Sequence, residues 1–150
     1  MKDQLILNKV CEGFLPIIPQ PKQSARFFSI KGKNGKNQIR SYTDPQKKKY
    51  ILDLSNLFTE KYCGDIIEKP LKFTGYLNMP FLKSQKKSDL KRGWCLHSVK
   101  PDVDNLLKPF FDSLEGSLYK NDSQICWHDV IKIRSEVVGI HYKFETVEIF

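Results

Sequence analysis

The sequence has no long hydrophobic run: nothing in it approaches the roughly 18 consecutive apolar residues that a membrane-spanning helix needs. Its first residues also lack an apolar stretch followed by small residues, the pattern of a cleaved secretion signal. We therefore expect a cytoplasmic protein without a membrane partner. With 150 residues, 40% of them hydrophobic, the chain can bury a core as one domain over residues 1–150, without disulfides or a structural metal.

Cysteine is scarce, and the four cysteines form no C-x-x-C pair, the spacing typical of zinc ribbons and thioredoxin-like redox sites. Two C-x-H pairs do occur, Cys95 with His97 and Cys126 with His128. On a strand, residues two apart share one face, so the four side chains could together bind zinc. The alternative is that the cysteines are reduced and simply buried.

Acidic residues are fewer than basic ones, 17 against 25, which gives a net charge of +8. The excess is uneven: residues 20–50 have a local net charge of +8, residues 83–101 have +5, and residues 102–150 have −4. Such a basic protein favours an anionic partner, and DNA is one. The acidic C-terminal third indicates a second kind of site.

The hydrophobic pattern predicts an α+β domain, with two main helices packed on a mostly antiparallel or mixed sheet. Residues 1–13 are poorly patterned, and residues 80–93, rich in Lys and Ser, are predicted to form a loop. Helices are predicted from Pro45 to near Gly64 and over 103–115. Strands are predicted over residues 14–18, 27–30, 39–42, 71–79, 94–99, 125–137 and 140–149.

Acidic residues gather around the second predicted helix. Asp102 and Asp104 lie where an extended segment runs into it, so their carboxylates should point the same way. Lys108 and Asp112 follow at four and eight residues from Asp104, on one helix face. Asp122 comes after the chain has turned back. This order can bring three carboxylates and a lysine together, a group suited to binding Mg²⁺ and hydrolysing a phosphodiester.

The same residues also have ordinary structural interpretations. Asp104 could cap the helix, Lys108 could pair with Asp104, and Asp122 could form a turn with Asn121. The spacing alone leaves both interpretations open.

Three runs of sequence resemble the signature of the RusA family of Holliday junction resolvases. They are residues 99–108 (VKPDVDNLLK), 111–114 (FDSL) and 119–125 (YKNDSQI). Residues 19–26 (PQPKQSAR) are similar to a segment with Pro and Lys/Arg that precedes them in the same family. The resemblance implies a homodimer that binds four-way DNA junctions in recombination and repair. It would cut two opposing strands by hydrolysis that depends on Mg²⁺ or Mn²⁺, with no small-molecule cofactor.

The resemblance also assigns roles to residues. Asp102, Asp104 and Asp122 match the family's metal-binding catalytic acids, and Lys108 matches its active-site lysine. Asn121 stands where family members often have a second acid, which lowers the local negative charge. We expect contacts to the DNA backbone from Lys22, Arg26, Lys31, Lys33, Arg40 and Lys100.

Two other functions stay open at this point. One is a non-catalytic basic DNA-binding protein whose acids only cap helices, and the other is a nucleic-acid-binding module stabilised by zinc at the two C-x-H pairs. For the predicted dimer, the apolar side of the second helix and the exposed edge of the last strands are both candidate contacts.

Overall fold

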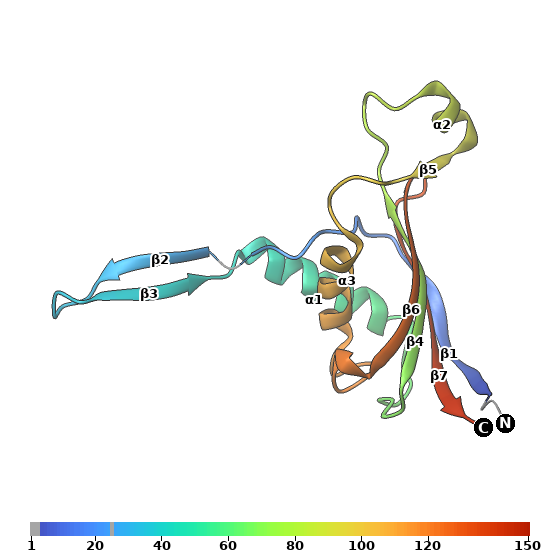
Figure 1. The fold of residues 1–150 in the computed structure, drawn as a ribbon, viewed down its shortest axis with the longest axis horizontal. Helices are drawn as coiled ribbons and strands as arrows, with labels where there is room; N and C mark the ends of the chain where they lie inside the picture. The colour runs from blue at the N-terminus through green and yellow to red at the C-terminus, as the bar shows by residue number, and fades with distance from the viewer. Residues whose placement is uncertain (1–3, 25) are drawn as a thin grey trace.

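The body of the protein is a five-stranded mixed sheet, seen in a computed structural model that describes residues 4–24 and 26–150 (Figure 1). The strand order is β1-β7-β4-β6-β5. β4 and β6 run parallel, and the other three pairings are antiparallel, which confirms the predicted α+β class. The strands are β1 (Leu5–Leu15), β4 (Leu71–Met79), β5 (Trp94–Leu96), β6 (Ile125–Ser135) and β7 (Gly139–Ile149).

Two helices, α1 (Pro45–Thr59) and α3 (Val103–Leu114), cover one face of this sheet (Figure 1). Their apolar residues recur with the helical period and meet the inward side chains of β4 and β7 in one core. Phe73 of β4 lies at its centre, with its ring 5.6 Å from that of Phe110 and 5.2 Å from that of Phe111. Each fully buried side chain of this size contributes roughly 2–3 kcal/mol, so the core fixes where α3 lies on the sheet.

The opposite face of the sheet is open in the part of the chain that the structure describes, with Tyr76, Trp127 and Ile131 exposed. Of the two candidate dimer contacts, one is wrong. The apolar side chains of α3 are buried within the chain itself. The other candidate stays open: β7 is an inner strand, but β5 pairs with only residues 133–135 of β6, so the rest of that edge of β6 has no neighbouring strand among the described residues.

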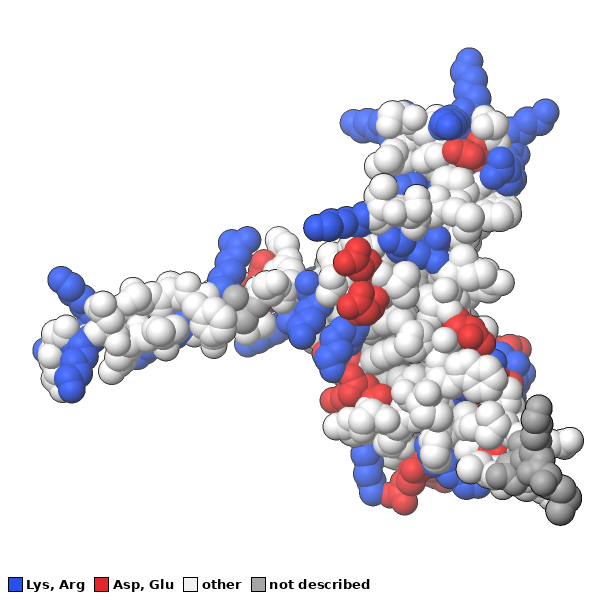
Figure 2. Space-filling view, in the orientation of Figure 1, with Lys and Arg blue, Asp and Glu red and all other residues white. Residues whose placement is uncertain are grey.

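A hairpin of β2 (Arg26–Lys31) and β3 (Asn37–Tyr42) projects from the body; we call residues 26–42 the arm (Figure 1). Every residue of its two strands is exposed, including Phe27 at 69% and Ile39 at 76%. The sequence predicted its two strands, over 27–30 and 39–42, and the structure shows that they pair and stand away from the core. Figure 2 shows basic side chains along the arm and at the end of the body near α2 (Lys87–Arg92).

Two predicted segments are wrong. The first strand runs over Leu5–Leu15 instead of 14–18, because a bulge between Lys9 and Cys11 shifts its side-chain alternation and hides the pattern. The predicted loop over 80–93 contains α2, and none of its residues is buried. Since hydrophobic periodicity reports burial, it carries no signal for such a helix.

The zinc hypothesis is also wrong. Cys126 and His128 stand at the start of β6, whereas Cys95 in β5 lies opposite Arg134, near the other end of β6. At about 3.3 Å per strand residue, the eight residues from 126 to 134 separate the two C-x-H pairs by roughly 26 Å. They therefore cannot share one ion, and all four cysteines are free thiols.

Among the described residues, no helix combines the length and the apolar character required to cross a membrane.

Candidate active site

The loop before α3 is held in place by a lysine of β6. Lys132 Nζ donates hydrogen bonds to the carbonyl oxygens of Val99 and Pro101, each at 2.5 Å. Both carbonyls come just before Asp102 in the chain, so the lysine fixes the backbone that leads into Asp102. This role could not be predicted, because nothing in the pattern around Lys132 separates it from a solvated strand lysine.

Arg134, on the same strand, supports the loop from its other end. It donates to the carbonyl oxygen of Pro80 at 2.7 Å and lies 3.1 Å from Nε2 of His97. His97 is buried, and burial together with the charges of Arg134 and Lys132 lowers its pKa. The ring is therefore neutral at physiological pH, and its Nε2 can accept the arginine hydrogen bond.

If the protein cuts DNA as the resemblance implies, we expect Lys132→Met to reduce the rate of cleavage by about 10- to 100-fold, since a shift of about 1 Å in a catalytic group has such effects. The variant keeps the apolar stem but loses both hydrogen bonds. DNA affinity, measured by fluorescence anisotropy, should change little. Lys143→Met, a lysine on the neighbouring strand β7 that pairs with Glu145, is the matched control. Equal cleavage by both variants would contradict the positioning role.

Asp102 and Asp104 lie at the start of α3 with free carboxylates. Asp102 is the N-cap residue through its backbone, and its carbonyl accepts the N–H of Leu106 at 3.2 Å, but its side chain makes no capping hydrogen bond. Asp104 follows in the first turn, and both residues are exposed. In residues 4–24 and 26–150, neither carboxylate forms an ion pair, because Lys108 pairs elsewhere. The interpretation of Asp104 as a cap paired with Lys108 is wrong.

Lys108 joins α3 to the segment that follows it. Its Nζ lies 2.5 Å from Oδ2 of Asp122 and 2.9 Å from Oδ1 of Asp112. The hydrogen bond to Asp122, followed by the one to Asp112, raises the pKa of Lys108 well above its usual range. The ammonium group is therefore charged at any physiological pH. Lys108 and Asp122 are thus brought together, one helical turn after Asp104.

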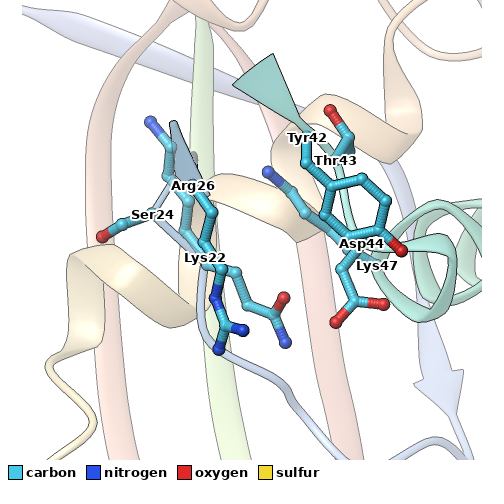
Figure 3. A pocket seen from close by; sticks show the side chains of 8 residues that line it. Lys22, Ser24, Arg26, Tyr42, Thr43, Asp44 and Lys47 are labelled. Atoms are coloured by element: carbon cyan, nitrogen blue, oxygen red, sulfur yellow. The ribbon is translucent and has the colours of Figure 1, made fainter. Parts of the chain in front are cut away.

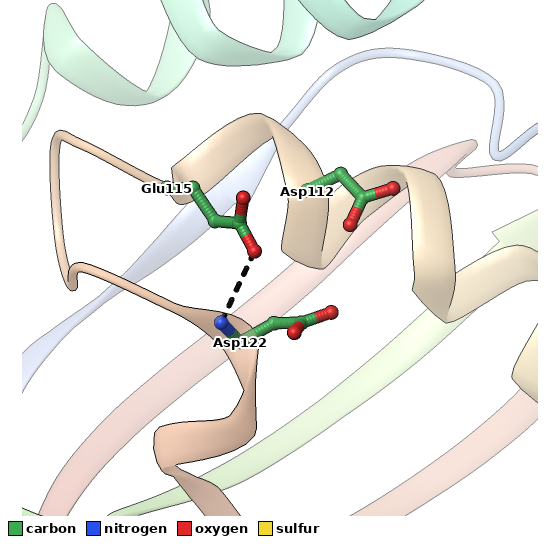
Figure 4. Close-up of side chains that lie close together, drawn as sticks. All are labelled: Asp112, Glu115 and Asp122. Carbon is green, nitrogen blue, oxygen red and sulfur yellow. Dashed lines mark hydrogen bonds between the residues drawn. The ribbon is translucent and has the colours of Figure 1, made fainter.

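Three acids cluster beside this lysine: Asp112, Glu115 and Asp122 offer carboxylate oxygens within 4.8 Å of one another (Figure 4). Glu115 also accepts the backbone N–H of Asp122 at 3.2 Å. Asp102 and Asp104 lie outside this cluster, earlier on α3, so only Asp122 of the predicted trio belongs to it.

Asn121 has a structural task in the same turn. Its side chain accepts the N–H of Ser123 at 2.9 Å and caps the short 3-10 helix η1 (Asp122–Gln124). Glu115 provides, from the residue after α3, the extra negative charge that Asn121 does not. The sequence analysis missed Glu115, because only the reversal of the chain between α3 and η1 brings it to Asp122.

The side chains present suit a hard divalent cation. Carboxylate oxygens are the ligands that Mg²⁺ prefers, and several are exposed along α3. The ammonium group of Lys108 already lies between Asp112 and Asp122, which shows that this end of the helix is built around a positive charge.

The expected DNA-contact residues are all exposed. They lie in the segment before the arm, in the arm itself and in the loop before Asp102: Lys22, Arg26, Lys31, Lys33, Arg40 and Lys100. Figure 2 shows acidic and basic side chains alternating over α3, between the basic arm and the basic end of the body. The arrangement places carboxylates where a DNA backbone attracted by its surroundings would lie.

Comparison with known families agrees with this geometry. The model of the family described as Endodeoxyribonuclease RusA matches residues 16–143. The chain belongs to the RusA family. The RusA match includes the arm and α3 with the acids Asp102, Asp104, Asp112, Glu115 and Asp122, and leaves residues 1–15 and 144–150 outside. Membership in a family of endodeoxyribonucleases argues against the non-catalytic DNA-binding alternative.

A relative in Bacillus subtilis (strain 168), called Uncharacterized protein YqaN, is 34% identical to this RusA-family chain over 110 residues. The matched region covers 69% of this chain and 75% of the relative. The two proteins therefore share most of the domain.

Proposed function

We propose that this RusA-family protein is a cytoplasmic endodeoxyribonuclease that resolves four-way (Holliday) junctions in recombination and repair, by hydrolysis that depends on Mg²⁺ or Mn²⁺. One observation carries the proposal. Lys108 is fixed by Asp112 and Asp122 one turn after the free carboxylate of Asp104 and within two turns of that of Asp102, on a helix flanked by basic surfaces. Acids with a purely structural role would cap helices or form ion pairs. Among the described residues, the carboxylates of Asp102 and Asp104 do neither.

Each residue of the site has a distinct role in this proposal. Asp102, Asp104 and Asp122 would hold the metal ion, with Asp112 and Glu115 adding negative charge around it. When bound, Mg²⁺ supplies an activated water and neutralises charge on the phosphate. Lys108 orients Asp122, and its ammonium group stabilises the negative charge that develops on the scissile phosphate.

The arm supports selectivity for branched DNA. Its strands are six residues long, so at about 3.3 Å per residue it reaches roughly 20 Å beyond the body. Lys and Arg on such a hairpin contact phosphates without reading bases. One duplex could therefore lie on α3 while the arm contacts a second, an arrangement that linear DNA does not offer.

The experiment is a comparison of a synthetic four-way junction with a linear duplex of the same sequence. In the presence of Mg²⁺ the purified protein should nick the junction much faster than the duplex, and EDTA should stop the reaction. Absence of divalent-dependent nicking would contradict the nuclease, and equal rates on the two substrates would contradict the junction selectivity.

Paired cuts in opposing strands require two active sites, which we propose that a homodimer supplies. Sedimentation equilibrium should then give twice the chain mass of 17.5 kDa at the protein concentrations that produce paired cuts. A monomer that still makes paired cuts would contradict this part of the proposal.

A further inference from the structure

A pocket lies at the base of the arm, where the chain enters β2 and leaves β3 (Figure 3). Lys22, Ser24 and Arg26 form one wall, and Thr43, Asp44 and Lys47 belong to the other. Its charged side chains are three cations and one carboxylate. That carboxylate caps α1: Oδ1 of Asp44 accepts the N–H of Gln46 at 2.9 Å.

The pocket offers the groups that bind a phosphodiester. An arginine and two lysines supply charge-assisted donors. Among the residues that the structure describes, none of the three cations has an acidic partner in a salt bridge. The positive charge of the pocket is therefore available to an anion.

The segment that leads into the first wall, residues 16–24 or the proline segment, is tied to both helices. The N–H of Gln20 donates to Oη of Tyr50 in α1 at 3.0 Å. The N–H of Lys22 donates to the carbonyl oxygen of Asn105 in α3 at 2.7 Å. The pocket is thus anchored to the body, although the arm beyond it stands free.

The second tie depends on a proline. In a regular helix the carbonyl of Asn105 would accept the N–H of residue 109, but Pro109 has no N–H to give. The carbonyl that Pro109 leaves free is the one that binds Lys22. Pro109 costs α3 one helical hydrogen bond and so lets α3 bind the proline segment. The link is at Asn105, between Asp104 and Lys108.

We propose that this pocket binds one phosphate of the DNA backbone and that the bond between Lys22 and Asn105 fixes the distance from this phosphate to the acidic site. The inference rests on the proposed function, since it sets which phosphodiester reaches α3. Contacts to phosphate position a protein on DNA, and a rigid contact of this kind determines where along the strand the cut falls.

Binding can be tested without cleavage. The amide signals of ¹⁵N-labelled protein are followed by NMR while the dinucleotide dTpdT, or inorganic phosphate, is added. With dTpdT we expect saturable shifts at Gln23, Ser24 and Thr43. Arg26→Gln with Lys47→Met should weaken that binding at least about tenfold. The matched pair Lys31→Met with Arg40→Gln, on the arm, should leave it within about twofold. Shifts with inorganic phosphate alone, or with neither probe, would overturn the assignment to DNA.

The link to α3 can be tested by mapping the cuts on a four-way junction. Arg26→Gln with Lys47→Met should spread the cuts over neighbouring phosphodiester bonds. Pro109→Ala should do the same, because it returns an N–H that competes for the carbonyl of Asn105. The arm pair should lower the amount of cutting without moving its position. Unmoved cuts in both pocket and Pro109 variants would overturn the positioning role. If wild-type protein binds dTpdT in the pocket but cuts no DNA, the proposed function fails and the pocket stands.

Discussion

Asp102→Asn and Asp104→Asn should each reduce the rate of junction cleavage by on the order of 10²–10³-fold, the usual cost of losing one group that stabilises developing charge. The amide keeps the shape of the side chain and removes the negative charge that would hold a divalent ion. Junction binding should be retained, because the contacts to phosphate come from the basic residues around α3. Single-turnover cleavage and anisotropy on the same preparations separate the two effects.

Asp65→Asn is the matched control, since Asp65 is an exposed acid outside the site. Thermal unfolding should show no loss of stability in Asp102→Asn or Asp104→Asn, because neither carboxylate caps α3 or pairs with a cation in the described part of the chain. If both variants cut at the rate of the wild type, the catalytic role assigned to this end of the helix is wrong.

Replacing Lys31, Lys33 and Arg40 together by alanine should weaken junction binding by about 100-fold near physiological salt. Each lost phosphate contact removes roughly 0.9 from the slope of log K against log salt, so three contacts lower the slope by about 3. The effect should be the same for different DNA sequences, because these side chains contact the backbone. Anisotropy titrations at several salt concentrations measure both quantities.

The comparison needs a variant with the same loss of charge. Alanine at Lys9, Lys61 and Lys69 removes three exposed lysines outside the arm, two of which pair with glutamates. If the two triple variants bind alike, the arm has no special role, and the net charge of the protein alone explains the affinity.

The site was only partly predictable. Lys108 and Asp122 could be named because the spacing along a helix and the return of the chain are local properties. The roles of three other residues could not be predicted, because their partners lie in other elements: Lys132 and Arg134 bind carbonyls far earlier in the chain, and Glu115 binds Asp122 across a turn. The hydrogen bonds from Lys132 to Val99 and Pro101 can form only after β6 has paired within the sheet.

The fold shows the same division. Regular alternation predicted β4 and the helical period predicted α3, since both elements bury one side against a core. The pattern did not predict the true extent of β1, because a bulge breaks its alternation. It did not predict α2 at all, because none of the residues of α2 is buried.

The sequence by itself determined the α+β class, the acidic motif and the uneven charge, because periodicity, composition and short spacings are written in neighbouring residues. The tertiary structure decided which acids meet, since Asp112, Glu115 and Asp122 converge only through the reversal after α3. It also ruled out the zinc site, by placing the two C-x-H pairs at opposite ends of β6. Distances between residues far apart in the chain are set by strand pairing and core packing, and no local pattern encodes them.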